Sequence, residues 1–397
     1  MTKVLNVITS MDPIYGGMCQ GIRNSIGYID SIEIDSDVVC LDEPDAEYLG
    51  NDNFKIIALG GKTSSWAYSK HLLPWLNKNI SKYQAIIVHG LWQYNGYAVR
   101  KALNQVRGKG ENTPKLFMMT HGMMDPYFQK APERKLKAIR NILFWKVIEK
   151  KIMNSANGIL FTCEEELLLA RKTFKGYSPK KEMNIGYGIL SPPSKNLTDI
   201  ESFKKRHDIL PDEEYFLFLS RLHHKKGLFN LLNAYSKALI EKIKLPKLIL
   251  AGPGIESEFG QKLYNLVEHD SLLKQHVKFI GMISGSEKWA SFYGAKAFIL
   301  PSHQENFGIA VVEALACKCP VIISNKVNIW REIEKGNGGI VSEDTEQATF
   351  EALKEYSSLS NSKLAKIKEN AFKVYLDNFT MEKTSRQYIK AITDASH

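Results

Sequence analysis

Residues 301–324, PSHQENFGIAVVEALACKCPVIIS, decide the fold of the second half of the chain. The run Ala297–Pro301 is apolar and has the length of a buried strand. Gly308 then breaks the pattern, and Ile309–Ala316 is typical of a helix with small residues on one side. The order is therefore strand, polar turn, helix. A helix start carries free backbone N–H groups and a partial positive charge, so this turn is well suited to bind a phosphate group.

Two glutamates flank this predicted phosphate-binding site. Glu305 lies in the turn before the helix, and Glu313 lies about two turns further along it. A carboxylate accepts hydrogen bonds and donates none, which suits sugar hydroxyls better than phosphate. The two carboxylates can therefore contact groups on opposite sides of a bound phosphate. The pattern favours a sugar nucleotide, in which a hexose and a ribose stand on opposite sides of a diphosphate.

Together with the flanking Pro-Ser, Asn-Phe-Gly and Glu-Ala-Leu-Ala, the stretch resembles the Glu-x7-Glu signature of retaining nucleotide-sugar glycosyltransferases of the GT-B fold, especially glycosyltransferase family 4. The resemblance implies that Glu305 contacts the transferred sugar and that Glu313 holds the ribose. It also implies that the backbone of Asn306, Phe307 and Gly308 meets the sugar and the phosphate.

Two cations in LSRLHHKKGLFN complete the predicted donor site. Arg221 and Lys226 follow the predicted strand Tyr215–Leu219 and precede a helix that starts near Gly227. Ligands of doubly wound sheets bind beyond the carboxyl ends of the strands, where two fixed cations can hold a diphosphate and stabilise it as it leaves. An isolated pair of this kind is usually a basic surface turn, but the spacing to the glutamates matches the arginine–lysine pair of the family.

Glycines after strands mark further predicted donor contacts. Gly252 follows the strand-like KLILA, where the turn serves either geometry or nucleotide binding. Gly16 and Gly17 follow the first strand and match the glycine loop that closes over the donor phosphate in the family. They do not form a GxGxxG fingerprint, so the main sequence evidence for a dehydrogenase function is lacking. Lys318 departs from the family, which often has a glycine before the next strand.

His121 is the predicted catalytic residue of the first half. It ends the fifth predicted strand, in FMMTHGMMDPYF, and the resemblance implies that it contacts the donor sugar near the reacting carbon. Asp125 either joins the acceptor side or caps the turn before Pro126. His89, at the neighbouring strand end, is a weaker candidate. The predicted catalytic set is His121, Arg221, Lys226 and Glu305.

The chain of 397 residues is long enough for two domains of about 200 residues each. Strand-like and helical segments alternate in both halves, which predicts an α/β protein with two Rossmann-like doubly wound sheets. The resemblance adds that the two GT-B domains face a central cleft. We expect an N-terminal acceptor domain over 1–190 and a C-terminal donor domain over 191–380. In GT-B enzymes the last helix often crosses back, so residues 381–397 are expected to pack on the first domain.

Composition indicates a globular protein that stays in the cytoplasm. The apolar fraction is 44% and the charged fraction 24%, and no apolar run approaches the roughly 18 residues needed to span a bilayer. The chain opens directly on strand-like sequence, without a signal peptide. The five cysteines form no CxxC pair, and we expect buried or partly buried free thiols.

The formal charge of +10 is concentrated in residues 130–151, which read as one amphipathic helix. This segment is either a packed helix with a solvated basic face or a surface that meets anionic lipid headgroups on the inner face of the plasma membrane. A peripheral position would suit a lipid-linked acceptor.

We expect no cofactor and no metal. Asp35-Ser-Asp37 spells the metal-binding DXD motif of the other large glycosyltransferase fold, but it precedes the second predicted strand and is expected to be a surface loop. Arg221, Lys226 and the helix N–H groups already meet the charge of the diphosphate. The expected function is retaining transfer of a hexose from a nucleoside diphosphate sugar to a hydroxyl of a glycan or glycolipid, in bacterial surface polysaccharide or glycolipid synthesis.

Two alternatives remain open. One is a sugar-nucleotide epimerase of related fold, which would isomerise the donor and need no acceptor. The other is a non-catalytic basic protein that binds lipid or nucleic acid, whose binding would fall steeply with salt. A mere binder has no need of the complete set of Arg221, Lys226, Glu305 and Glu313, and we expect no nucleic-acid partner.

Overall fold

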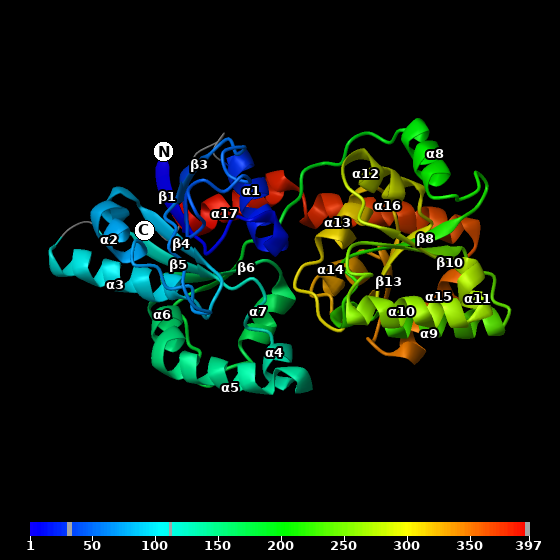
Figure 1. The fold of residues 1–397 in the computed structure, drawn as a ribbon. Coiled ribbons are helices and arrows are strands. Elements are labelled where there is room, and N and C mark those ends of the chain that lie inside the picture. Colours follow the sequence, from blue (N-terminus) through cyan, green and yellow to red (C-terminus); the bar gives the residue numbers. More distant parts are fainter. Residues whose placement is uncertain (30–33, 111–112, 394–397) are drawn as a thin grey trace. The chain divides into compact units, whose positions relative to one another are not determined.

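The computed structural model describes residues 1–29, 34–110 and 113–393. The chain forms two compact units (Figure 1). Unit 1 comprises Met1–Gly188 together with Met381–His397, and unit 2 comprises Ile189–Thr380. The division between the units therefore falls close to residue 190, and the last helix, α17 (Met381–Thr393), belongs to unit 1.

Unit 1 is built on a seven-stranded sheet in the order β3-β2-β1-β4-β5-β6-β7, in which all paired strands are parallel. The strands are β1 (Thr2–Val7), β2 (Ile34–Cys40), β3 (Lys55–Ala58), β4 (Ala85–His89), β5 (Lys115–Met119), β6 (Gly158–Phe161) and β7 (Glu182–Asn184). Because the order reverses at β1, the ends of β1 and β4 flank the switch point of this sheet, where such folds bind ligands.

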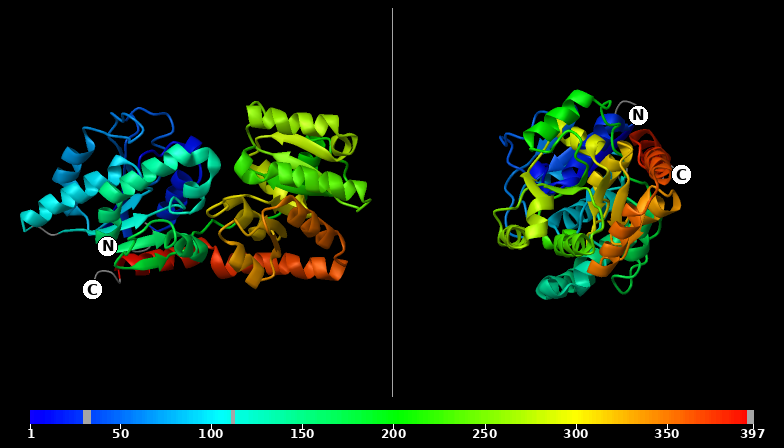
Figure 2. Two further views of the ribbon diagram at one scale, coloured as in Figure 1. Left: turned by 90° about the horizontal axis from the view of Figure 1, so that it is seen from below. Right: turned by 90° about the vertical axis from the view of Figure 1, so that its right-hand side faces the viewer.

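Helices cover both faces of this sheet (Figures 1 and 2). Leu5 and Val7 pack on one face with side chains of α2, α3 and α6, while Ile8 and Val38 pack on the other with α1, which also contacts α17. The helices are α1 (Gly17–Ile29), α2 (Leu72–Asn79), α3 (Tyr94–Gly108), α4 (Tyr127–Lys130), α5 (Lys135–Phe144), α6 (Lys150–Ser155) and α7 (Glu164–Ala170), with short 3-10 turns η1 (Pro13–Tyr15), η2 (Ile80–Lys82) and η3 (Pro132–Arg134).

The single helix predicted over 130–151 is wrong in detail. The segment is divided into η3, α5, a π-helical turn η4 (Trp145–Glu149) and α6. Within η4, Glu149 is buried, and its Oε1 accepts a hydrogen bond from the Trp92 backbone N–H at 2.8 Å. Its Oε2 is also buried and has no hydrogen-bond partner among the described residues. Burial raises the pKa of the Glu149 carboxyl to about 7, although the Trp92 N–H opposes this effect.

Glu149 should make the stability of unit 1 depend on pH. Between the unfolded pKa near 4.5 and the folded pKa near 7, the folded state binds more protons, so stability falls as the pH rises through this window. Glu149→Gln keeps an acceptor for Trp92 and removes the charge. We expect it to stabilise the fold by about 2 kcal/mol at pH 8 and by much less at pH 5, measured by thermal unfolding.

Glu164→Gln is the matched control for this experiment, because Glu164 is exposed on α7. Its unfolding temperature should differ little from that of the wild type at either pH. A gain for Glu149→Gln that is equal at pH 5 and pH 8 would contradict the assignment of the pH dependence to this carboxyl.

Unit 2 carries a six-stranded parallel sheet in the order β10-β9-β8-β11-β12-β13. Its strands are β8 (Tyr215–Leu219), β9 (Lys247–Ala251), β10 (Val277–Gly281), β11 (Ala297–Leu300), β12 (Val321–Ser324) and β13 (Gly339–Ser342). The chain winds outward from β8 through β9 to β10 and then returns to β11 beside β8. The turns that follow β8 and β11 therefore lie together at the switch point of this sheet.

Helices also cover both faces of the second sheet. Figure 1 shows α9, α10, α11 and α15 on one side and α8, α12 and α16 on the other. The helices are α8 (Leu197–Arg206), α9 (Leu228–Ile240), α10 (Glu258–His269), α11 (Ser271–His276), α12 (Gly285–Gly294), α13 (Ile309–Ala316), α14 (Trp330–Lys335), α15 (Glu346–Ser357) and α16 (Asn361–Asn378), with the 3-10 turn η5 (His224–Lys226) before α9. The predicted α/β class with two Rossmann-like doubly wound sheets is confirmed.

Asp35-Ser-Asp37 is not the surface loop that we expected. It lies within β2, and Asp37 is buried and accepts a hydrogen bond from the Tyr83 hydroxyl at 2.7 Å. Lys3 Nζ lies 3.4 Å from Asp35 and 3.6 Å from Asp37. The buried Asp37 carboxylate thus has partners from β1 and from the segment before β4, while Asp35 is exposed, which is why both are tolerated in this strand.

The five cysteines are all buried free thiols, as expected. Among the described residues, no helix combines the length and the apolar character that crossing a bilayer requires.

Candidate donor site and histidine pair

Gly308 sets the backbone that leads into α13. It has a φ of 76°, in the left-handed region, and a Cβ there would lie 3.1 Å from the Val311 side chain and 3.3 Å from that of Glu305. Glycine is therefore the residue that fits this turn between β11 and α13. The predicted strand, turn and helix are confirmed in unit 2.

Glu305 is held from both sides of its backbone. Its N–H donates to the Lys326 carbonyl at 2.9 Å, and its carbonyl accepts from the Asn328 N–H at 3.0 Å. The side chain forms an ion pair with Lys226. Both side chains are mostly buried, and a contact of this kind fixes the positions of both groups. The structure thus joins two residues that the sequence separates by 79 positions.

Lys226 reaches Glu305 because the chain after β8 is folded tightly against the chain after β11. Lys226 ends the 3-10 turn η5, and Gly227 follows it with a φ of 68°. A Cβ on Gly227 would lie only 2.0 Å from the Pro301 carbonyl oxygen. The close approach of these two backbones at Gly227 brings the cation of one strand end to the carboxylate of the next.

Arg221 lies on the turn beside Gly252. The Leu222 N–H donates to the Pro253 carbonyl at 2.9 Å, and a Cβ on Gly252 would lie 2.0 Å from the Ser220 carbonyl oxygen. Gly252 therefore has a packing role here, whichever contact it makes with a ligand. The Arg221 side chain is exposed, and no ion pair engages it within the described part of the chain. Its guanidinium is available to an anion.

Glu313 occupies the middle of α13 and is mostly buried. It forms an ion pair with Lys288 of α12, with 2.6 Å between Lys288 Nζ and Glu313 Oε1. Burial raises the pKa of the Glu313 carboxyl, and the charge of Lys288 opposes that rise. Nothing in the sequence pattern pointed to Lys288, which lies in SEKWASF without a motif around it.

Asn306 and Phe307 sit in the turn between Glu305 and Gly308. The Asn328 side-chain amide donates to Asn306 Oδ1 at 3.4 Å, which ties the turn to the segment after β12. The Phe307 ring is buried and meets Phe379 edge to face, with 5.6 Å between ring centroids. Side-chain packing thus anchors this turn while its backbone leads into the helix start.

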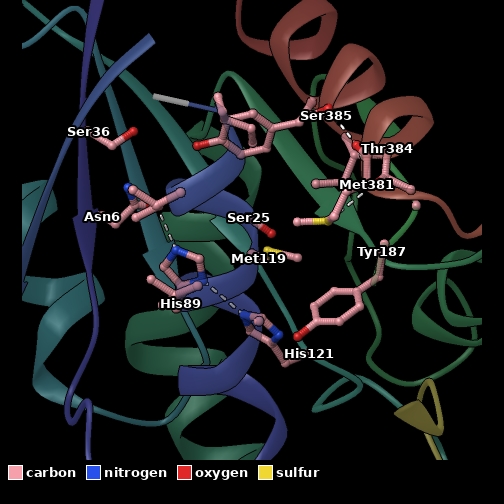
Figure 3. A pocket seen from close by; sticks show the side chains of 18 residues that line it. Asn6, Ser25, Ser36, His89, Met119, His121, Tyr187, Met381, Thr384 and Ser385 are labelled. Atoms are coloured by element: carbon pink, nitrogen blue, oxygen red, sulfur yellow. Dashed lines mark hydrogen bonds between the residues drawn. The ribbon is translucent and has the colours of Figure 1, made fainter. Parts of the chain in front are cut away.

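In unit 1, the structure brings His121 next to His89. His89 Nδ1 and His121 Nε2 are 3.0 Å apart, and His89 Nε2 lies 3.0 Å from Asn6 Oδ1 (Figure 3). Burial lowers the pKa of His89 well below its ordinary value, and the charge of His121 acts in the same direction. Although His121 is partly exposed to solvent, its packed surroundings lower its pKa to about 4. Both imidazoles are therefore neutral at neutral pH.

Glu166 supports this histidine pair from α7 and was missed by the sequence interpretation. Its carboxylate accepts four hydrogen bonds, from the Thr120 hydroxyl, the Gly122 N–H, and the N–H and hydroxyl of Thr162. These contacts fix the turn on which His121 adopts a φ of 48°. A non-glycine residue in that conformation is strained, so the surrounding bonds must hold it.

Gly16, Gly17 and Asp125 have defined local roles. Gly16 has a φ of 76° with open space around its Cβ position, and Gly17 is the first residue of α1. The Gly17 carbonyl accepts a hydrogen bond from the Tyr187 hydroxyl at 3.0 Å. Asp125 Oδ1 accepts from the Tyr127 N–H at 2.8 Å, so this side chain caps its own turn, which was one of the two roles considered for it.

Two hollows in the structure lie away from the predicted donor residues of unit 2. One, of about 540 Å³, is lined by residues 191–195, the ends of α12 and α13, and α16. The other, of about 40 Å³, adjoins the histidine pair in unit 1. Lys318, at the edge of the larger hollow, has a φ of 57°. It thus adopts the left-handed conformation that a glycine would favour at the place where the resembling family often has one.

The chain resembles known proteins both in sequence and in structure. The sequence profile of the glycosyl transferases group 1 family matches residues 199–374. A probable sucrose-phosphate synthase of Thermosipho melanesiensis is 27% identical over 179 residues, which cover 44% of this chain and 40% of that protein. The human alpha-1,3/1,6-mannosyltransferase ALG2 is 27% identical over 222 residues, which cover 53% of this chain and 52% of that protein. The matches thus span about half or less of these relatives.

Likeness in structure extends over the whole chain. The crystal structure of HepE from Anabaena in complex with UDP-glucose aligns with a TM-score of 0.72 and 16% sequence identity, covering 99% of this chain and 100% of that one. Agreement at such low identity concerns the fold alone. It confirms the predicted GT-B fold.

Proposed function

Because residues 199–374 match the sequence profile of the glycosyl transferases group 1 family, we propose that this protein is a retaining glycosyltransferase. It transfers a hexose from a nucleoside diphosphate sugar to a hydroxyl of a glycan or glycolipid, in the synthesis of bacterial surface polysaccharide or glycolipid. The observation that carries the proposal is the Lys226–Glu305 ion pair at the switch point of unit 2, next to the start of α13. HepE, which has the same fold, binds UDP-glucose, and this supports a nucleotide-sugar donor.

In the proposed donor complex, each charged group has its own task. Arg221 and Lys226, together with the N–H groups at the start of α13, neutralise the diphosphate. These positive charges require no metal ion for that task. Glu305 accepts hydrogen bonds from the transferred hexose, and Glu313, held by Lys288, accepts them from the ribose. Asn306, Phe307 and Gly308 contribute backbone groups, and Gly252 lies beside the nucleoside.

The proposed reaction exchanges one bond at the anomeric carbon. The bond from this carbon to the phosphate oxygen breaks, and a bond to the acceptor oxygen forms on the same face. The acceptor hydroxyl gives its proton to the departing phosphate oxygen. The protein then contributes mainly positioning and charge stabilisation, which Arg221 and Lys226 supply at the diphosphate. From unit 1, Gly16 and Gly17 meet the donor phosphate, and His121 contacts the transferred sugar.

Products formed from a panel of donors test this proposal. The purified protein would be incubated with UDP-glucose, GDP-mannose and related nucleotide sugars, with octyl glycosides as acceptors, and followed by proton NMR. We expect one donor to yield an octyl disaccharide that keeps the anomeric configuration of the donor. A product of inverted configuration would refute the retaining mechanism, and isomerised donor without transfer would identify an epimerase. Absence of turnover with every donor would contradict the enzymatic function.

A basic apolar surface on unit 1 supports a peripheral membrane position on the cytoplasmic side. The helix α5 and the turn η4 pack on unit 1 through Ala138, Asn141, Trp145 and Glu149. Four apolar residues of this segment are largely exposed: Leu136 by 84%, Ile139 by 57%, Leu143 by 58% and Val147 by 68%. An apolar stripe of this kind in water marks an interaction surface.

Basic residues surround this apolar stripe, and their charge indicates the kind of partner that the surface binds. The exposed basic residues of the segment 130–151 are Lys130, Lys135, Lys137, Arg140, Lys146, Lys150 and Lys151. An exposed apolar stripe between cations on one helix matches a layer of anionic headgroups above acyl chains. We therefore propose that residues 130–151 bind an anionic membrane surface and bring the enzyme to a lipid-linked acceptor.

Charge reversal tests this membrane proposal. Each basic residue near an anionic surface contributes about 1 kcal/mol, so the triple variant Lys135→Glu, Lys137→Glu, Arg140→Glu should weaken binding by about 100-fold or more. Binding is measured by co-sedimentation with vesicles that contain phosphatidylglycerol, at low salt.

The matched control reverses three exposed lysines of α16, Lys363, Lys366 and Lys373, which changes the net charge equally. This control should sediment with the vesicles nearly as well as the wild type. Equal loss in both variants would mean that net charge alone drives binding, and it would contradict a dedicated surface at residues 130–151.

A further inference from the structure

Asn6, His89 and His121 form a continuous hydrogen-bonded chain across three neighbouring strands of unit 1. Asn6 lies on β1, His89 ends β4, and His121 follows β5, and these strands are adjacent in the sheet. Figure 3 shows His89 between the other two, with one ring nitrogen toward Asn6 and the other toward His121. Each of the two contacts measures 3.0 Å, which is a normal hydrogen-bond length.

The proton positions along this chain follow from Asn6. The atom of Asn6 that faces His89 is the carbonyl oxygen Oδ1, which carries no proton, so His89 Nε2 must donate to it. Neutral imidazole has one N–H, and His89 Nδ1 is then an acceptor. His121 Nε2 must therefore donate to His89 Nδ1. Since His121 is neutral as well, its proton is used in that bond and its Nδ1 is bare.

The surroundings keep the chain in this state. His89 is fully buried among neutral groups, which disfavours an imidazolium. The charged group that acts on His121 is Glu166, which favours protonation. The Glu166 carboxylate already accepts four hydrogen bonds, two from the His121 turn and two from Thr162. Burial outweighs its effect on the pKa of His121. No described donor reaches His121 Nδ1, and the side chain is partly open to solvent.

We propose that Asn6 and His89 are positioning residues that hold His121 as the tautomer with a bare Nδ1, which accepts a hydrogen bond from a hydroxyl of the transferred sugar. The inference rests on the proposed function, in which His121 contacts that sugar. It adds a chemical role: His121 recognises a hydroxyl as a neutral acceptor and takes no proton in the reaction. A histidine has two possible tautomers, and the bond made by its other nitrogen decides between them.

Nitrogen-15 NMR of the full chain, labelled at histidine, tests the tautomer without any substrate. The His121 signals are identified by their loss in His121→Gln, and the one-bond and two-bond couplings show which nitrogen carries the proton. We expect His121 to be protonated at Nε2 and bare at Nδ1, without change between pH 8 and pH 5.5. A proton on Nδ1 would overturn the proposal, because it would mean that the Asn6 amide donates to His89 and the chain runs in the opposite direction.

Asn6→Leu removes the acceptor that sets the direction of the chain. His121 should then populate both tautomers, and kcat for transfer should fall about tenfold, the equivalent of one lost hydrogen bond, with little change in the donor KM. Ser36→Ala is the matched control, because Ser36 lines the same 40 Å³ hollow and its hydroxyl has no hydrogen-bond partner among the described residues. It should leave both the tautomer and kcat unchanged.

The two measurements separate this inference from the proposed function. If Asn6→Leu lowers kcat while the His121 tautomer stays as in the wild type, Asn6 acts only through the fold and the proposal fails. If the wild-type tautomer is as expected but no donor is turned over, the error lies in the proposed function. Should Asn6→Leu fail to fold, the wild-type spectrum alone still decides the direction of the chain.

Discussion

Replacing Lys226 with methionine is expected to lower kcat/KM for sugar transfer by about 100-fold to 1,000-fold, the usual cost of removing one preorganised charge from a developing anion. In the structure Lys226 forms an ion pair with Glu305 and lies at the switch point of unit 2. In the proposed reaction, negative charge grows on the diphosphate as the sugar leaves, and the Lys226 ammonium would stabilise it. The loss should therefore appear mainly in kcat, measured with saturating donor.

Lys225→Met provides the matched control, since Lys225 precedes Lys226 directly and its Nζ contacts Gln304 Oε1 at 3.2 Å. Its kcat/KM should stay within a few-fold of the wild type. The double variant Lys226→Met, Glu305→Gln completes a cycle. If the two residues act on one donor, the double variant should lose much less than the product of the single losses. Full additivity would contradict the functional pairing of Lys226 and Glu305.

Replacing Gly227 with alanine is expected to destabilise unit 2 by about 3–5 kcal/mol, because two separate penalties add. Gly227 has a φ of 68°, a left-handed conformation that costs an alanine about 1–2 kcal/mol. In addition, its Cβ would lie 2.0 Å from the Pro301 carbonyl oxygen, so one backbone must move. Thermal unfolding of the variant should begin well below that of the wild type, and any folded fraction should bind nucleotide weakly.

Gly281→Ala separates the two penalties. Gly281 has a φ of 71°, but a Cβ there meets no atom within 4 Å. This control should lose only the conformational part, about 1–2 kcal/mol. Equal losses at Gly227 and Gly281 would show that the approach of the β8 turn to Pro301 is not tight, and the geometric basis of the Lys226–Glu305 pair would be wrong.

Local sequence was sufficient for the central elements of unit 2. The apolar run at β11, the glycine at 308 and the small residues of α13 each follow a local rule, so the strand, turn and helix could be predicted with accurate bounds. The proximity of Lys226 and Glu305 followed from the rule that ligands bind beyond the carboxyl ends of neighbouring strands. The edge strands β7 and β13 were missed, because their sequences, EMN and GIVS, do not form a continuous apolar run like that of β11.

Partners supplied by distant segments could not be predicted. Lys288 pairs with Glu313 from a different helix, and Glu166 organises the turn of His121 from α7. Neither lies in a motif, and both act through contacts that only the folded chain creates. The same reason explains the wrong prediction for Asp35-Ser-Asp37, where Tyr83 and Lys3 make two carboxylates acceptable within a strand.

The basic helix shows a different limit of sequence patterns. Periodicity identified an amphipathic segment over 130–151 but not which side of it packs. The structure buries Ala138 and Asn141 together with Trp145, and it leaves Leu136 and Val147 exposed. An apolar stripe is normally the buried side of a surface helix. The departure from that rule is what now favours a membrane contact over a solvated basic face.

The most direct test of a donor site in unit 2 is thermal unfolding of the purified protein with UDP, GDP, ADP, CMP and dTDP in turn, with Glu313→Ala in parallel. A ligand at 100 times its dissociation constant stabilises a fold by about 2.7 kcal/mol, which is readily measured. We expect one nucleotide to raise the unfolding temperature of the wild type and to do so much less in Glu313→Ala. If no nucleotide stabilises the wild type, or if the stabilisation is equal in both proteins, the proposed donor site around α13 is contradicted.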